Sequence, residues 1–188
     1  GKGGNRVTSI ARIDGNTEDS RLAQVLDVEQ ILRDVLPSTT EVITPEKVGP
    51  KIKLPAGKMI LAADDSPLAR SMIEKELKTL DVPYVMTHTG LEAWKRIQSI
   101  SDTAAAEGKT LHDKVALVLT DLEMPEMDGF TLTRNIKSDQ RFKSVPVVIH
   151  SSLTGEANEN HVKSVGADAF IAKFEAGELA EAIRKALA

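Results

Sequence analysis

Hydrophobic and polar residues change their spacing repeatedly over the last two-thirds of the chain. Short apolar runs, of the length expected for buried strands, alternate with longer stretches in which apolar residues recur every three or four positions. The apolar runs are Met59–Ala63, Val82–Thr87, Val115–Thr120, Val145–His150 and Ala169–Ala172. The helical patterns cover Pro67–Leu80, Leu91–Ile100, Thr131–Ser138, Glu156–Val165 and Glu178–Leu187. This alternation predicts an α/β fold with a parallel sheet covered by helices on both faces.

Two other segments precede this region. Residues 1–36 combine two apolar stretches with a short helical pattern, which predicts a strand–strand–helix fragment too small to bury its own apolar side. Residues 37–57 contain four prolines and no sustained periodicity, so they are predicted to be a linker. Residues 58–188 then form the main domain. Within it, Ser101–Lys114 is predicted to be a polar connection between two elements.

Composition excludes several classes of protein. The absence of cysteine rules out disulfides and thiolate metal sites and fits a reducing compartment. No apolar run approaches the roughly 20 residues that cross a bilayer, so membrane insertion is not expected. The net charge of −4 argues against nucleic acid as a partner, because phosphate binding needs clustered Lys and Arg. The chain begins with Gly1 rather than Met, which suggests a piece of a longer protein.

Polar residues stand where the predicted strands end. In an open parallel sheet, ligands bind beyond the carboxyl ends of the strands. At these ends lie Asp64 and Asp65, Asp121, Ser151 and Lys173. Taken singly, an aspartate here also suits a helix N-terminus or a turn, and Lys173 suits a solvated surface. Together, three carboxylates repel one another and need a cation, and oxygen ligands suit Mg²⁺ or Mn²⁺.

The segment from Val118 to Gly129, VLTDLEMPEMDG, resembles the signature of response-regulator receiver domains. In that family an aspartate ends the third strand and a Met-Pro-x-Met-Asp-Gly loop follows. The acidic pair, Ser151 and Lys173 match the other family positions in order and approximate spacing. The resemblance implies a flavodoxin-like, doubly wound sheet of five strands in the order 2-1-3-4-5, with five helices. Gly129, after Asp128, is expected to lie in a tight turn, where glycine permits a positive φ.

The resemblance also implies a role for each residue. Asp121 would accept a phosphoryl group, Lys173 would pair with a phosphate oxygen, and Ser151 would donate a hydrogen bond to another. Magnesium would be held by Asp65, Asp121 and the backbone carbonyl of Glu123, with support from Asp64. Ser151 and Phe170 would form the switch, although Phe170 also suits a permanently buried core position. The output face would be built by residues 156–165, the fifth strand and the last helix.

Other residues depart from the family or remain open. Phe174 follows the lysine, where the family usually has proline. Glu123 and Leu153 are expected to tune the lifetime of the acyl phosphate. His150 is expected to point away from Ser151 and to have a structural role.

The first segment resembles the end of a CheW-type coupling domain, over Thr8–Gly15 and Arg21–Leu32. A coupling domain, a linker and a receiver form the arrangement of CheV-type chemotaxis proteins. This implies a cytoplasmic, non-enzymatic module that is phosphorylated by a chemotaxis histidine kinase and modulates its coupling to chemoreceptors. One alternative is a phosphate sink that drains the kinase. Another is an aspartate-nucleophile phosphatase, although Glu123 stands where such enzymes need a second aspartate.

Overall fold

Five parallel strands form the centre of the part that this computed structural model describes, residues 43–152, 156–173, 175 and 177–187. The strands are β1 (Met59–Ala63), β2 (Tyr84–Thr87), β3 (Val115–Asp121), β4 (Val147–Ser151) and β5 (Ala169–Ala172). Their order in the sheet is β2-β1-β3-β4-β5, which confirms the predicted α/β fold and strand order. The fragment predicted over residues 1–36 lies outside the described residues.

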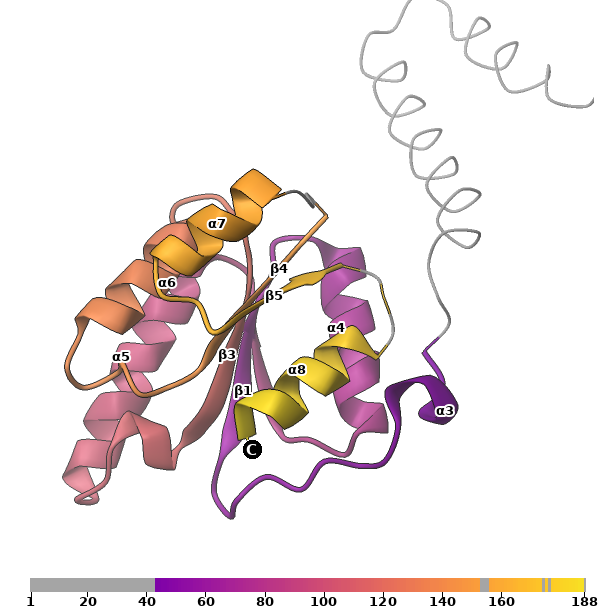
Figure 1. The fold of residues 1–188 in the computed structure, drawn as a ribbon. Helices are drawn as coiled ribbons and strands as arrows, with labels where there is room; N and C mark the ends of the chain where they lie inside the picture. Colours follow the sequence, from indigo (N-terminus) through magenta and orange to yellow (C-terminus); the bar gives the residue numbers. More distant parts are fainter. Residues whose placement is uncertain (1–42, 153–155, 174, 176, 188) are drawn as a thin grey trace, which may run out of the picture. The chain divides into compact units, whose positions relative to one another are not determined.

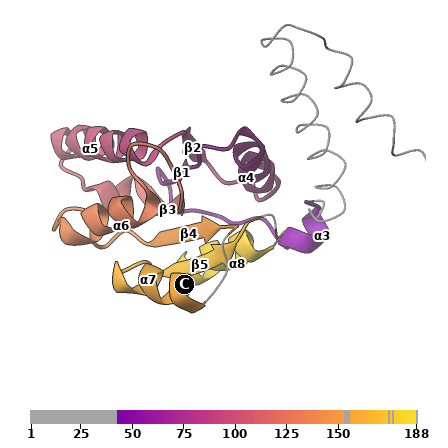
Figure 2. The ribbon, with the colours of Figure 1, turned by 90° about the horizontal axis from the view of Figure 1, so that it is seen from above.

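Helices cover both faces of the sheet (Figure 1). They are α3 (Pro45–Val48), α4 (Pro67–Thr79), α5 (Gly90–Ala106), α6 (Gly129–Ser138), α7 (Glu156–Ser164) and α8 (Glu178–Leu187), with a 3₁₀ turn at Leu111–Asp113. The view from above shows α4 and α8 on one side and α5, α6 and α7 on the other (Figure 2). The described elements therefore form three layers, as expected for a doubly wound sheet.

The core is divided by the sheet into two clusters. Every residue of β3 is buried, because this central strand has helices on both sides. Side chains alternate between faces along a strand. Leu117 and Leu119 therefore pack with the apolar sides of α4 and α8, whereas Val118 packs with those of α5, α6 and α7.

Helix α5 is longer than the sequence pattern predicted. It continues to Ala106, into the stretch that was expected to be a polar connection. Ser101 and Ala104 are buried and extend the inner side of the helix begun by Ala93 and Ile97. Alanine is the best helix former, and small side chains can pack closely against the sheet. The prediction was wrong here because the inner side carries small residues rather than large apolar ones.

Residues 43–52 of the predicted linker also differ from expectation. Ile43, Val48 and Ile52 are buried and belong to the core cluster beneath α4 and α8. These apolar residues are separated by prolines and charged residues, so they show no helical or strand periodicity in the sequence. Tertiary packing, rather than local pattern, orders this segment.

Gly129 is required by close packing rather than by a positive φ. It is the first residue of α6, and its φ is not positive; the left-handed residue of the preceding loop is Glu126, with φ 68°. A Cβ atom on Gly129 would lie 2.2 Å from the backbone oxygen of Asp121. The expectation of a left-handed glycine was therefore wrong, although glycine is still needed.

Substitution of Gly129 by Ala is expected to destabilise the fold by about 1–3 kcal/mol, the usual cost of overpacking. The added methyl group must push the backbone of Asp121 away from α6. Urea unfolding would measure the loss. Thr131→Ala, at an exposed position two residues further along the same helix, is the matched control and should change stability much less. Equal stability of Gly129→Ala and wild type would contradict the packing argument.

Candidate functional site

The carboxyl ends of four strands meet at one edge of the sheet. Asp64 follows β1, Asp121 ends β3, Ser151 ends β4 and Lys173 follows β5. The ends are level because Asp121 pairs with His150 across β3 and β4, and Ser151 pairs with Ala172 across β4 and β5. The strand-end argument from the sequence therefore placed these residues at the same edge.

Three carboxylates gather at this edge. Asp64, Asp65 and Asp121 each offer an oxygen atom, and these atoms lie within 4.8 Å of one another. Asp64 is fully buried and Asp121 is 4% exposed, whereas Asp65 is exposed. Asp64 Oδ1 accepts a hydrogen bond of 2.8 Å from the backbone N–H of Ser66. The start of α4 thus fixes one carboxylate, and Asp65 leaves the cluster open to solvent.

Lys173 bridges two of these carboxylates. Its Nζ atom lies 2.9 Å from Asp64 Oδ2 and 3.0 Å from Asp121 Oδ1, and its side chain is only 10% exposed. Burial lowers the pKa of Lys173, but hydrogen bonds and charge interactions with Asp64 and Asp121 outweigh this and raise the pKa above its ordinary value. The lysine is therefore held charged.

One ammonium group does not balance the acidic cluster. Burial and the charge of Asp64 raise the pKa of Asp121 to about 7, against the opposing effect of Lys173. Asp64 Oδ2 is buried, and Lys173 Nζ at 2.9 Å is the cation that faces both it and Asp121. Hard divalent cations prefer such oxygen ligands. The cluster of carboxylate oxygens therefore suits Mg²⁺ or Mn²⁺ as the additional positive charge.

His150, for which the sequence analysis expected a structural role, lies against the site. It is 4% exposed, and its Nε2 atom lies 3.4 Å from Asp64 Oδ2. Burial and the charge of Lys173 lower the pKa of His150 to about 3, so the ring is neutral. It lines the same side of the sheet as Val148, and alternation along β4 turns Ser151 to the other side. The signal in the sequence was a polar residue at an inward position of a buried strand.

The remaining predicted residues lie around this centre. Ser151 is 2% exposed, and its backbone oxygen accepts a 3.0 Å hydrogen bond from the N–H of Lys173. Glu123, two residues beyond β3, is exposed. Phe170 pairs with Ile149 and packs, only partly buried, against the core beneath α5, α6 and α7. Leu153 and Phe174 lie outside the described residues.

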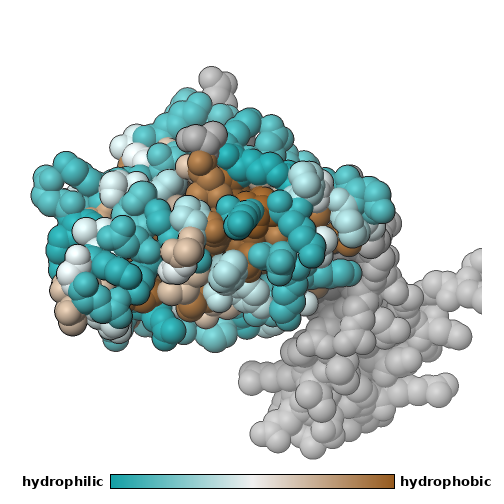
Figure 3. Space-filling view, turned by 90° about the horizontal axis from the view of Figure 1, so that it is seen from below, coloured by the Kyte–Doolittle hydropathy of each residue, from teal (hydrophilic) through white to brown (hydrophobic). Residues whose placement is uncertain are grey.

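A groove lies between strands β4 and β5 and helix α8. Its volume is about 540 Å³, and Phe170, Ala182 and Lys185 are among the residues that line it. On the face seen from below, apolar residues gather around a hollow bordered by hydrophilic side chains (Figure 3). Strand β5 and helix α8, two of the three elements expected to form the output face, thus border a groove with both apolar and charged residues.

The profile of the response regulator receiver domain family matches residues 60–184. The chain belongs to the response regulator receiver family. Receiver domains bind Mg²⁺ at an acidic pocket, and the cluster of Asp64, Asp65 and Asp121 has the composition of such a pocket. Membership of the family also confirms the resemblance that the loop after β3 indicated.

The similar proteins include chemotaxis receivers. The chain is 32% identical to chemotaxis protein CheV2 of Helicobacter pylori over 184 residues, which is 97% of this chain and 54% of that protein. It is 30% identical to chemotaxis protein CheY1 of the same organism over 115 residues, or 61% of this chain and 83% of that protein. The receiver chain therefore spans about half the length of the CheV relatives that it matches.

Solved receivers share the fold. The receiver domain of the histidine kinase CKI1 from Arabidopsis thaliana, complexed with Mg²⁺ and BeF₃⁻, is 28% identical with a TM-score of 0.59, covering 69% of this chain and 89% of that one. CheY4 of Vibrio cholerae, at 23% identity and a TM-score of 0.55 over 70% of this chain and 97% of that one, supports the fold alone. Among the described residues, no helix is both long and apolar enough to cross a membrane.

Proposed function

We propose that this receiver is the phosphoacceptor of a chemotaxis signalling protein, with Asp121 as the acceptor residue. The observation that carries the proposal is the position of the Asp121 carboxylate, 3.0 Å from Lys173 and beside the buried Asp64. This arrangement provides a nucleophilic oxygen, a fixed positive charge and ligands for a cation at one strand edge. Phosphoryl transfer needs mainly such positioning and charge stabilisation.

The acceptor reaction follows from these groups. One oxygen of Asp121 attacks the phosphorus of a phosphohistidine, a P–O bond forms, and the P–N bond breaks with its electron pair passing to the imidazole. Lys173 holds positive charge beside Asp121 and can pair with an oxygen of the arriving phosphoryl group. Asp64, Asp65, Asp121 and the backbone carbonyl of Glu123 would hold Mg²⁺, which when bound neutralises charge on the transferring group.

The response to phosphorylation would begin at Ser151. Its hydroxyl group donates a hydrogen bond to the phosphoryl group and draws the end of β4 toward Asp121. Phe170, on the neighbouring edge strand, then turns inward and changes the groove between β5 and α8. The support for this step is the pairing of β4 with β5, which joins Ser151 to Ala172 and Ile149 to Phe170.

The wider role is that of a CheV-type protein. Its support is that the alignments with CheV2 and CheV1 extend over 97% and 98% of this chain, beyond the matched receiver residues. A chemotaxis histidine kinase would donate the phosphoryl group, and the coupling domain expected in a CheV-type protein would bind chemoreceptors. The module acts in the cytoplasm, without turnover of an external substrate, by modulating receptor–kinase coupling.

Calorimetry with Mg²⁺ and then beryllofluoride tests the proposed function. Mg²⁺ should bind at the acidic cluster, and beryllofluoride, a mimic of the phosphoryl group, should bind only once Mg²⁺ is present. Manganese should replace magnesium. Binding of neither ion to the folded chain would contradict the proposal, and steady hydrolysis of a generic phosphate ester would favour a phosphatase instead.

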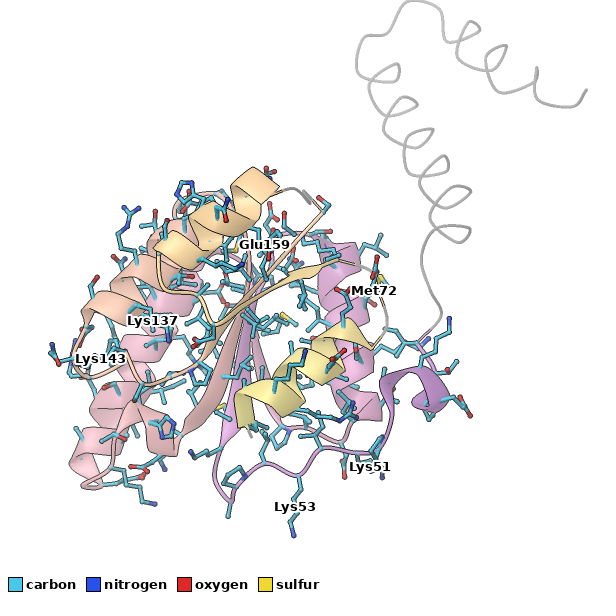
Figure 4. The ribbon with its side chains drawn as sticks, in the orientation of Figure 1. Lys51, Lys53, Met72, Lys137, Lys143 and Glu159 are labelled. Carbon is cyan, nitrogen blue, oxygen red and sulfur yellow. The ribbon has the colours of Figure 1, made fainter. Side chains whose placement is uncertain are left out.

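Glu123→Asn is expected to change the rate of acyl-phosphate hydrolysis several-fold. The substitution removes an exposed negative charge two residues from Asp121. The electric field that acts on the phosphoryl group and on the attacking water therefore changes. Decay of the phosphorylated protein would be followed by intact mass. Glu159→Gln, an exposed carboxylate on α7 (Figure 4), is the control. An unchanged lifetime of the acyl phosphate in Glu123→Asn would contradict this role for Glu123. In the wild type, an acyl phosphate that decays much faster than the signalling response would favour a phosphate sink.

A further inference from the structure

A short segment before the receiver sheet is docked between α4 and α8. Residues 43–52, here called the strap, contain α3, and that helix contacts both α4 and α8. Ile43, Val48 and Ile52 are 7%, 1% and 9% exposed. Lys51 of the strap and Lys53, which directly follows it, point outward (Figure 4). The strap thus inserts its apolar side chains into the core and leaves its charges in solvent.

Polar contacts hold the backbone of the strap at both helices. Arg184 of α8 donates hydrogen bonds through Nη2 to the carbonyl oxygens of Val48 and Pro50, at 2.7 and 2.6 Å. The N–H of Ile52 donates to the carbonyl oxygen of Leu80, at the end of α4, at 3.0 Å. Hydrogen bonds to a charged donor are stronger than neutral ones. The strap is therefore bound specifically, and not only by apolar burial.

The strap also contacts the chain that leaves the acidic site. Gly177 lies four residues after Lys173, has φ +96°, and approaches the strap so closely that a Cβ atom on it would lie 2.8 Å from the carbonyl oxygen of Lys47. Its N–H donates to Glu76 Oε1 of α4 at 3.3 Å. Lys173 is thus only four positions in the chain from a residue that closely approaches α3.

A second path runs through the interior. A small cavity of about 40 Å³ is lined by Ile43 at one end of the strap and by Lys173 and His150 of the site. Ile43 of the strap and Lys173, which contacts Asp121, therefore line the same cavity.

The strap is not part of the receiver fold itself. The family profile begins at residue 60, after the strap, and every strand of the sheet follows residue 58. The strap is the route by which the upstream chain reaches the receiver. Its docking is thus an additional feature that the strands do not require.

We propose that the strap is an intramolecular coupling element, which passes the state of Asp121 to the chain upstream of residue 43. The inference rests on the proposed function. When Lys173 moves from the carboxylates to a phosphoryl group, Gly177 is displaced as well, and its contact with Lys47 changes. Thermodynamic linkage makes this coupling reciprocal. If the phosphoryl mimic shifts the docking equilibrium of the strap by some factor, docking of the strap changes the affinity of the site for the mimic by that same factor.

Hydrogen exchange on the full chain tests the first direction. With Mg²⁺ and beryllofluoride, exchange at residues 43–52, including the Ile52 amide, should change by a measurable factor relative to Mg²⁺ alone. The amides of α5, which packs on the opposite face of the sheet, serve as the internal control and should change less.

Substitution of Arg184 by Gln tests the converse direction. It removes the charged donor to the strap, and the affinity for beryllofluoride should change at least about fivefold, the lower range of allosteric coupling. Lys75→Gln, at an exposed position of α4, is the control and should have no effect. Gly177→Ala, which forces a side chain toward Lys47, should act like Arg184→Gln from the other side of the contact.

The outcomes separate this inference from the proposed function. If beryllofluoride binds wild type but strap exchange does not change and all variants bind equally, the coupling inference is overturned and the proposed function stands. If beryllofluoride does not bind wild type in the presence of Mg²⁺, the proposed function fails and the coupling inference fails with it.

Discussion

Replacing Asp121 by Asn is expected to abolish uptake of a phosphoryl group from acetyl phosphate. The amide has the shape of the carboxylate but lacks the nucleophilic charge, and no other described carboxylate lies within the reach of Lys173 except Asp64. Intact mass after incubation with Mg²⁺ and the donor would measure the uptake. Asp128→Asn is the matched control, because this exposed residue caps α6 and asparagine caps equally well. Phosphorylation of Asp121→Asn at the wild-type level would contradict the assignment.

The same variant should be more stable than wild type in a chelating buffer at high pH. The pKa of Asp121 is raised from 3.8 to about 7, so the fold disfavours its ionised form. Wild type therefore loses stability as pH rises from about 4 through 7, whereas the amide does not titrate. Each pKa unit corresponds to about 1.4 kcal/mol, so the gain of the variant is at most about 4 kcal/mol. Urea unfolding at pH 5 and pH 8 measures the difference, and parallel pH profiles would count against it.

Lys173→Met is the second substitution with a large expected effect. It keeps an apolar stem of similar length but leaves Asp64 and Asp121 buried without their shared cation. Removing one partner of a buried ion pair typically costs about 3–5 kcal/mol. We expect a loss of about 3 kcal/mol in chelating buffer and partial recovery with Mg²⁺, which binds the same carboxylates. Thermal and urea unfolding with and without Mg²⁺ would measure both effects.

The electrostatic origin of this loss can be isolated. In the double variant Asp64→Asn/Lys173→Met, one buried charge is removed together with the lysine, so the loss should be smaller than in Lys173→Met alone. Lys185→Met, an exposed lysine on α8, controls for the change of side chain. Equal losses in the single and double Lys173 variants would show that packing, not charge, is responsible.

Most of the fold could be predicted because strands and helices here have different hydrophobic periods. The buried runs identified all five strands, and the order of the sheet followed from the resemblance of the Asp121 loop. Tertiary packing decided the remainder. Helix α5 extends to Ala106 because small residues such as Ser101 and Ala104 meet the sheet, and Ile43, Val48 and Ile52 are ordered by contacts with distant helices. The hydrophobic periodicity of the sequence reveals neither the extension of α5 nor the ordering of these three residues.

The residues of the site that lie at the ends of strands could be predicted from the sequence. Since parallel strands end at one edge, the sequence placed Asp64, Asp121 and Lys173 near one another, and the distances of 2.9 and 3.0 Å confirm it. The contact of His150 with Asp64 was not predicted, because it depends on the relative register of β1 and β4. These strands are not neighbours, since β3 lies between them, and no spacing in the chain reveals that register.

Identification of the phosphorylated residue is the most direct test of the central claim. The chain would be incubated with acetyl phosphate and Mg²⁺, reduced with borohydride, which converts an aspartyl phosphate to homoserine, and analysed by peptide mass mapping. The structure predicts homoserine at residue 121 with Mg²⁺ and none when the metal is chelated. Homoserine at another aspartate, or labelling of residue 121 that does not depend on a divalent cation, would contradict the account.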